Sequence, residues 1–275
     1  MNPEVITALL NAGLIDMATA DIMRRQQDDN TARAWAETLV NEASQAGLSA
    51  QQQRLLDLVS STEGRPTAAQ LNAFWTGENG LLWQALESAI IQVATERAAF
   101  AVSANIDTFA LVNQQVIQWV ENYYANGTDP GSVGSLNATS RQQFADAFTR
   151  WQRGDVPFSQ AEGLDGLIEL LTPVFGPNRA EMIGITETTR VFVEAQRLAE
   201  ANNPYTVAFR WLTSADEAVC PICGPMHGQI RRKNEGYAGG VDLPAHVRCR
   251  CHEVPETEAT LQQPLPPEER FVFNG

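Results

Sequence analysis

The stretch Cys220-Pro-Ile-Cys223, followed after a loop by His246-Val-Arg-Cys249-Arg-Cys251, holds every cysteine of this 275-residue chain. Two close cysteine pairs separated by a loop, with a histidine just before the second pair, have the spacing of a tetrahedral zinc site. A Cys-x-x-Cys turn brings two sulfur atoms onto one ion, and cysteines two positions apart on an extended segment face the same way. The stretch therefore predicts a small module organised by a metal ion.

The motif offers five donors for the four places of a tetrahedral ion. Either Cys220, Cys223, Cys249 and Cys251 all bind and His246 stands beside them, or His246 binds with three cysteines and one of Cys249 and Cys251 is left over. A catalytic zinc ion keeps one position open for water, whereas a structural one is closed by protein ligands. We therefore expect one structural Zn²⁺ per chain.

Two other uses of the cysteines are disfavoured. Structural disulfides form in oxidising compartments, and residues 1–28 lack the charged and apolar regions of a signal peptide. A zinc deaminase carries its His/Glu element before the Cys-x-x-Cys, whereas Cys251-His252-Glu253 follows it here. The chain also has no phosphate-binding glycine loop, nucleophile elbow or His-Glu-x-x-His, so we expect no enzymatic activity.

Upstream of the cysteines the sequence is rich in Ala, Leu, Gln and Glu, with apolar residues at helical spacing. We expect breaks at 28–31, at 48–49 and at the glycines of 77–80, and a helix start at Pro66-Thr67. The fold class that follows is mainly α, with a helical N-terminal region, a helical middle and a small β-containing zinc-binding module near the C-terminus. The expected N-terminal helices are 2–28, 31–46, 49–61, 66–100 and 105–125.

The glycine- and proline-rich residues 126–135 indicate a connection, and further helices are expected after it. Asn178 and Glu181 stand at the positions of a capping box that opens the last helix, and Glu187 can pair with Arg190 one turn later. Alternating large apolar residues predict a strand at 205–212. The other expected elements are helices 140–153, 159–171 and 179–201, a strand at 248–254, and an extended or disordered tail at 255–275.

The net charge of −14, with 33 acidic against 19 basic residues, opposes sequence-independent binding to nucleic acid. Five cations fall in the cysteine segment, but acidic residues are interspersed, so we expect a solvated surface of mixed charge. No apolar run reaches the ~18–20 residues of a membrane helix, and we expect no membrane contact. The five cations are Arg231, Arg232, Lys233, Arg248 and Arg250.

The order of motifs in the second half resembles the phage minor head proteins of the Mu F-like head-morphogenesis family. A helix carrying Thr-Glu-x-x-Arg within 179–190 is followed by a strand with Trp211, then by Cys-x-x-Cys and finally by His-x-x-Cys-Arg-Cys. By this resemblance Glu187 and Arg190 form the helix signature, and the zinc-site motif comprises Cys220, Cys223, His246, Cys249 and Cys251. The implied organisation is a helical N-terminal region 1–125, a linker 126–140, a head-morphogenesis-like domain 141–254 with its zinc module at 205–254, and the tail 255–275.

The resemblance implies a structural protein that is made in the host cytoplasm and incorporated into the virion, inside the head near the portal. Its expected partners are the portal protein and other head proteins, and nucleic acid only indirectly or weakly. Its expected role is in capsid assembly and in DNA packaging or delivery. The alternative that the residues leave open is a cellular zinc-ribbon module that binds nucleic acid or a protein partner.

Overall fold

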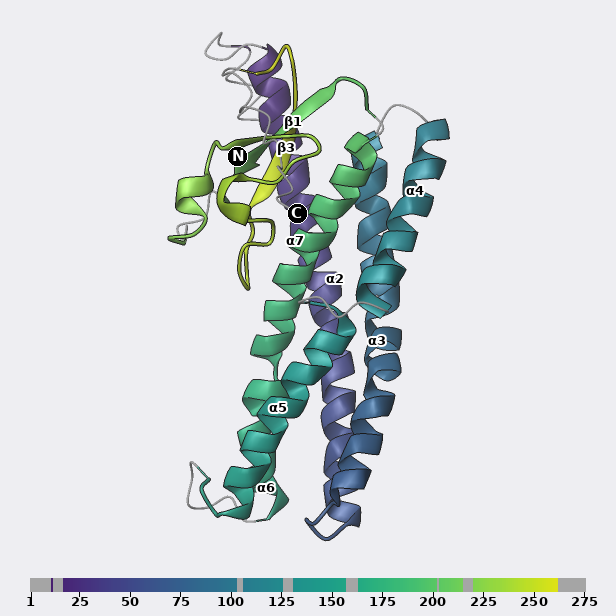
Figure 1. The fold of residues 1–275 in the computed structure, drawn as a ribbon, viewed down its shortest axis with the longest axis vertical. Coiled ribbons are helices and arrows are strands. Elements are labelled where there is room, and N and C mark those ends of the chain that lie inside the picture. Colours follow the sequence, from purple (N-terminus) through teal and green to yellow (C-terminus); the bar gives the residue numbers. More distant parts are fainter. Residues whose placement is uncertain are drawn as a thin grey trace, which may run out of the picture.

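The protein is an elongated bundle of helices with a small β-sheet lying against one end (Figure 1). The computed structural model describes residue 11 and residues 17–102, 106–125, 131–156, 163–201, 203–214 and 220–261. Parts of the predicted helix 2–28, of the linker and of the tail lie outside these ranges. The predicted class, mainly α with a small sheet near the C-terminus, is confirmed.

The two longest helices, α2 (Met17–Ser61) and α3 (Ala68–Val102), are joined by a short turn. The predicted helix start at Pro66-Thr67 is confirmed, because the Thr67 and Gln70 side chains each bond the other's backbone N–H, at 3.3 and 2.8 Å. The break expected at 28–31 is wrong. Asp29 does not end a helix there; its carboxylate instead forms an ion pair with Arg97 of α3.

The breaks expected at 48–49 and at 77–80 are also wrong, because packing overrides the low helix propensity of glycine. Gly47 sits where α2 and α3 touch: an added Cβ would lie 2.9 Å from Leu82 Cδ1. Gly77 and Gly80 face open space. A helix tolerates such glycines at about 1 kcal/mol each when its opposite face is well buried.

Five further helical segments complete the bundle. Helix α4 (Ile106–Val120) continues into a π-helical turn, η1 (Glu121–Ala125). Helix α5 (Val133–Gln152) begins earlier than predicted, because Ser132 caps it by accepting a hydrogen bond from the Ser135 N–H. Its first turns therefore occupy part of the expected linker 126–140. Helix α6 (Leu164–Phe175) ends four residues later than expected, and α7 (Pro177–Ala201) follows it directly.

The start of α7 differs from the predicted capping box. The helix begins at Pro177, a residue favoured at the first helical position, so Asn178 already lies inside it. The side chains of Asn178 and Glu181 do not cap the helix; both accept hydrogen bonds from Arg248. The N-terminus of α7 is thus bound to the cysteine segment.

Helix α7 lies in the middle of the protein and is buried along most of its length. Two apolar clusters meet on it. One joins α7 to α2, α3, α4 and η1 through residues such as Val191 and Phe192, and the other joins it to α2, α5 and α6 through Ala180 and Ile183. Within the described ranges, no helix combines the length and the apolar character that a membrane span requires.

The sheet has three antiparallel strands in the order β2-β1-β3, with β1 (Thr206–Leu212) in the centre. The strand predicted at 205–212 is therefore confirmed. The strand predicted at 248–254 is shifted, because β3 runs over His252–Thr257 and takes up the first residues of the expected tail. Strand β2 (Ile230–Arg232) is too short to be detected from its sequence. Two 3₁₀ turns, η2 (Gly224–Met226) and η3 (Ala238–Gly240), flank it.

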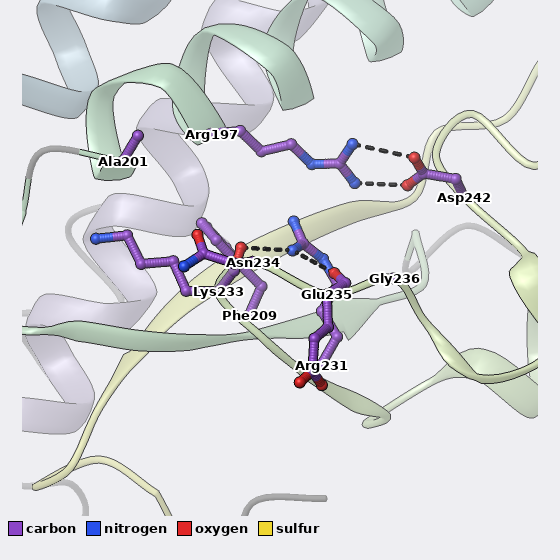
Figure 2. Close-up of a pocket in the computed structure, with 9 residues that line it drawn as sticks. All are labelled: Arg197, Ala201, Phe209, Arg231, Lys233, Asn234, Glu235, Gly236 and Asp242. Carbon is purple, nitrogen blue, oxygen red and sulfur yellow. Dashed lines mark hydrogen bonds and ion pairs between the residues drawn. The ribbon is translucent and has the colours of Figure 1, made fainter. Parts of the chain in front are cut away.

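A buried ionic network ties this sheet to α7. Glu253 of β3, whose side chain is fully buried, binds Arg197 of α7 at 2.6 Å and Arg231 of β2 at 2.8 Å. Figure 2 shows the pocket beside this network, with Arg197 reaching over to Asp242. The third cation of the pocket, Lys233, donates to the Asn203 carbonyl at 2.7 Å. The cations of the pocket are thus bound by oxygens of the chain itself.

We expect Gly184→Ala to destabilise the protein, because α7 and α2 touch through this glycine. An added Cβ would lie 3.0–3.1 Å from the Cβ, Cα and N of Asn41, so the Asn41 backbone must move. The free energy of unfolding in urea should fall by about 1–3 kcal/mol, as for other overpacked sites. Gly80→Ala is the matched control: it adds a methyl group to a helix in open space and should raise stability by up to about 1 kcal/mol. A Gly184→Ala protein as stable as the parent would contradict this close contact.

Candidate metal centre

The structure brings all five predicted donors together. Cys220 and Cys223 flank the turn before η2, and the other three lie on the segment that leads into β3. They form two overlapping groups, Cys220/Cys223/His246 and Cys223/Cys249/Cys251, in each of which the donor atoms lie within 4.8 Å of one another. Cys223 belongs to both groups and is the centre of the cluster.

The spacing of the donors suits a single ion. Cys223 Sγ lies 3.2 Å from His246 Nε2 and 3.9 Å from Cys249 Sγ, and all four cysteines are free thiols. A tetrahedral ion with metal–sulfur and metal–nitrogen distances of about 2.3 and 2.0 Å holds its donors roughly 3.3–3.8 Å apart. Four thiols and one imidazole are the ligand types preferred by soft and borderline metal ions. The residues therefore fit a metal centre.

The imidazole of His246 is oriented for binding by its own backbone. Its Nδ1 lies 2.7 Å from the Val247 carbonyl oxygen, so a protonated Nδ1 donates a hydrogen bond to this oxygen. A neutral ring that donates at Nδ1 carries its lone pair at Nε2, which faces Cys223. Metal-binding histidines commonly have this arrangement, in which a carbonyl holds the second nitrogen.

The thiols share their protons unequally. The hydrogen bond from Cys251 lowers the pKa of Cys249 to about 5, and the same bond raises the pKa of Cys251. Burial, and then the neighbouring Cys249 thiolate, raise the pKa of Cys223 to about 12. Without an ion the cluster thus holds protons that a bound cation would displace.

A turn, not a strand, presents Cys249. Arg248 has a positive φ of 63°, which ends any extended conformation before the cysteine. For this reason the predicted strand 248–254 begins only at His252. Cys249 and Cys251 are nevertheless both buried, and both face the cluster, as their spacing indicated.

This turn is held on α7 by two threonines. The Arg248 N–H donates to Thr186 Oγ1 at 2.9 Å, and the Thr189 hydroxyl donates to the Cys249 carbonyl at 2.5 Å. Thr189 Oγ1 also accepts a hydrogen bond from Arg33 of α2, at 2.9 Å. The metal loop is therefore attached to two helices through one hydroxyl group.

A second attachment comes from the arginine between the last two cysteines. Arg250 binds the carboxylate of Glu37 on α2 through two nitrogens, at 2.9 and 3.0 Å. Such a bidentate pair fixes orientation as well as distance. Sequence reasoning did not detect Arg33, Glu37, Thr186 or Thr189 as site residues. The one available signal was the one-turn spacing of the two threonines, because nothing in the sequence pairs α2 with the cysteines.

The pair named as the helix signature, Glu187 and Arg190, faces away from the metal. Glu187 is buried and accepts hydrogen bonds from the Tyr124 hydroxyl at 2.9 Å and from Arg190 at 3.0 Å. Burial raises the pKa of Glu187, and Arg190 opposes the shift. Gly131 packs so closely on this carboxylate that a Cβ would lie 2.6 Å from its oxygen. The pair is not solvated; it joins α7 to η1 and to the start of α5.

Adjacent threonines of α7 give a matched test of the attachment. Thr188 and Thr189 are both fully buried, but only Thr189 has hydrogen-bond partners. Thr189→Val should lower the free energy of unfolding by about 1–3 kcal/mol, because it leaves a carbonyl and a guanidinium N–H unpaired. Thr188→Val removes a hydroxyl without a partner and should be neutral or stabilising. Equal effects in urea unfolding would contradict the role of the Thr189 bonds.

The central position of Cys223 predicts a ranking of metal affinities. Cys223→Ser removes a donor from both groups and should weaken Co²⁺ binding by about 100-fold or more, above the range for residues that only support a ligand. Cys220→Ser removes a donor from only one of the two groups and should cost less. Titration with Co²⁺, followed by its sulfur-to-metal charge-transfer absorption, measures both. Wild-type affinity in Cys223→Ser would refute the arrangement.

Comparison with known proteins gives one match. Residues 160–254 match the family model described as phage Mu protein F like protein, and this segment includes α7, β1, β2, the first half of β3 and all five donors. Neither the curated proteins nor the solved structures contain a match to the chain. Over this segment, which carries the candidate metal centre, the chain is similar to the phage Mu protein F-like family, and the similarity suggests a phage head-related protein.

Proposed function

We propose that the protein is a phage minor head protein that associates with the portal and acts in head assembly and in DNA packaging or delivery. One observation carries the proposal. The matched segment and the metal cluster form one structural unit, because two threonines of the motif helix hold the loop that presents Cys249. In this proposal the protein resides in the virion, inside the head near the portal, after synthesis in the host cytoplasm.

We assign Zn²⁺ to the cluster as a structural ion, one per chain. Thiolate and imidazole donors suit zinc, and five donors around four places leave no position for a reacting water. The apolar core of the module is small: it consists of Val193, Trp211, Met226, Tyr237 and Leu243 together with three of the cysteines. Zinc can contribute about 10–16 kcal/mol to the folding of such modules. The proposed role of the site is therefore stability, not catalysis.

The N-terminal helices provide a surface for the proposed partners. Large apolar side chains on α2, α3 and α4 are about two-fifths to one-half exposed, which is typical of protein contact sites when such residues gather. A groove between α2 and α3 includes two of them, Trp35 and Phe100. We assign contacts with the portal and other head proteins to this part of the chain. The exposed residues are Trp35, Leu81, Phe100 and Leu111.

The alternative, a zinc ribbon that binds nucleic acid, needs free cations near the cysteines. Arg231 is bound to Glu253, Arg248 to Glu181 and Arg250 to Glu37. Together with the net charge of −14, these pairs leave little positive field for phosphate. The favoured role is therefore contact with proteins.

The proposal predicts that zinc and head assembly depend on the same residues. Purified protein should contain about one zinc per chain by elemental analysis. In a phage that lacks the gene, a plasmid copy with Cys223→Ser should fail to restore filled heads. His227→Ala is the control, because this histidine lies in the same module but outside the cluster. Normal heads from Cys223→Ser, or protein that holds no zinc, would overturn the proposal.

A further inference from the structure

Arg33 of α2 is a buried cation without a carboxylate of its own. Its side chain is 6% exposed and lies over the Phe192 ring, 5.3 Å from the centroid. Nη1 donates to Thr189 Oγ1, whereas Nη2 has no hydrogen-bond partner. Among the described residues no ion pair involves Arg33. Burial of an unpaired charge costs free energy, so this cation needs a compensating anion.

The carboxylates around Arg33 are already bound to other arginines. Asp29 pairs with Arg97, and Glu37 pairs with Arg250. Among the described residues, three guanidinium groups (Arg33, Arg97 and Arg250) thus stand against two carboxylates, which leaves one positive charge on the face of α2 that meets the cysteine loop.

The metal centre would carry the opposite charge. A divalent ion with three thiolates and one imidazole has a net charge of −1, and with four thiolates it has −2. Both ligand sets left open by the sequence therefore leave a negative centre. Cys249 belongs to the four-cysteine set and to one of the two sets that include His246. Its backbone carbonyl is separated from Arg33 by only the Thr189 hydroxyl, at 2.9 and 2.5 Å.

We propose that Arg33 is the counter-charge of the metal–thiolate centre, so that retention of the ion depends on the contact between α2 and the cysteine loop. The inference rests on the zinc site assigned under the proposed function. It gives α2, which lies outside the family match, a part in the metal site of the matched segment.

The Thr189 hydroxyl links Arg33 to the Cys249 carbonyl in a chain of two hydrogen bonds. It accepts from Arg33 and donates to the Cys249 carbonyl, so the two bonds reinforce each other. Burial lowers the pKa of Arg33, while Asp29, Glu37 and Cys249 raise it. The electrostatic partners of the guanidinium therefore already include one of the cysteines.

The test measures the zinc affinity of the full chain by competition with a chromophoric chelator. Arg33→Met should weaken Zn²⁺ binding about 10–100-fold, the usual effect of removing a group that supports a ligand. Arg33→Lys keeps the charge and should recover most of the loss. Arg179→Met is the matched control: Arg179 is also 6% exposed, but it bonds the carbonyls of Leu136 and Val174. It should lower stability and leave the zinc affinity unchanged.

Asp29→Asn separates charge from structure. It removes a carboxylate that acts on Arg33 but pairs with Arg97 of α3 and not with the cysteine loop, so a counter-charge role predicts tighter zinc binding, whereas a purely mechanical role predicts unchanged binding. If Arg33→Met does not fold, this variant and Arg33→Lys still test the inference.

The outcomes are distinct. Unchanged affinity in folded Arg33→Met, equal losses in Arg33→Met and Arg33→Lys, or unchanged affinity in Asp29→Asn would each overturn the inference while the zinc assignment stands. A wild-type chain without zinc would overturn the proposed function, and the inference with it.

Discussion

The hydrogen bond from the Thr189 hydroxyl to the Cys249 carbonyl is the contact on which the arrangement of the protein depends. It joins the helix that lies in the middle of the bundle to the loop that presents Cys249 to the candidate metal centre. The same oxygen accepts a hydrogen bond from Arg33 of α2, so three segments that are far apart in the sequence meet at one atom. Because all three groups are buried, loss of any one leaves polar atoms without partners and without access to water.

Helix α7 divides its polar residues between two sides. Thr186 and Thr189 face the metal loop, whereas Glu187 and Arg190 face η1 and the start of α5. Five consecutive positions thus hold the metal module on one side and the helical bundle on the other. Farther along, Arg197 extends the first side by binding Glu253 of β3. The module is therefore fixed to α7 at its first turns, its middle and its C-terminal half.

Sequence patterns predicted the local features well. The cysteine spacing, the strand at 205–212 and the helix that begins near Pro177 depend on residues close together in the chain, and all three appear in the structure. The helix breaks failed because they were inferred from glycine and polar residues alone. At Gly47 and Asp29 the deciding contacts come from α3, which no local pattern in α2 encodes. Arg33 and Glu37 were not predicted for the same reason, because their partners lie more than 150 residues away in the sequence.

The unbroken length of α2 has a mechanical consequence. Its 45 residues extend over about 68 Å at 1.5 Å per residue, and both apolar clusters of the bundle pack on it. A continuous helix of this kind resists bending and transmits displacement along its axis. A force applied to the α6 end of the bundle would therefore reach the cysteine loop as a movement of Arg33 and Glu37. The part of α2 from Arg33 to Ser61 is thus a stiff connection between the α6 end of the bundle and the loop that carries the candidate metal donors.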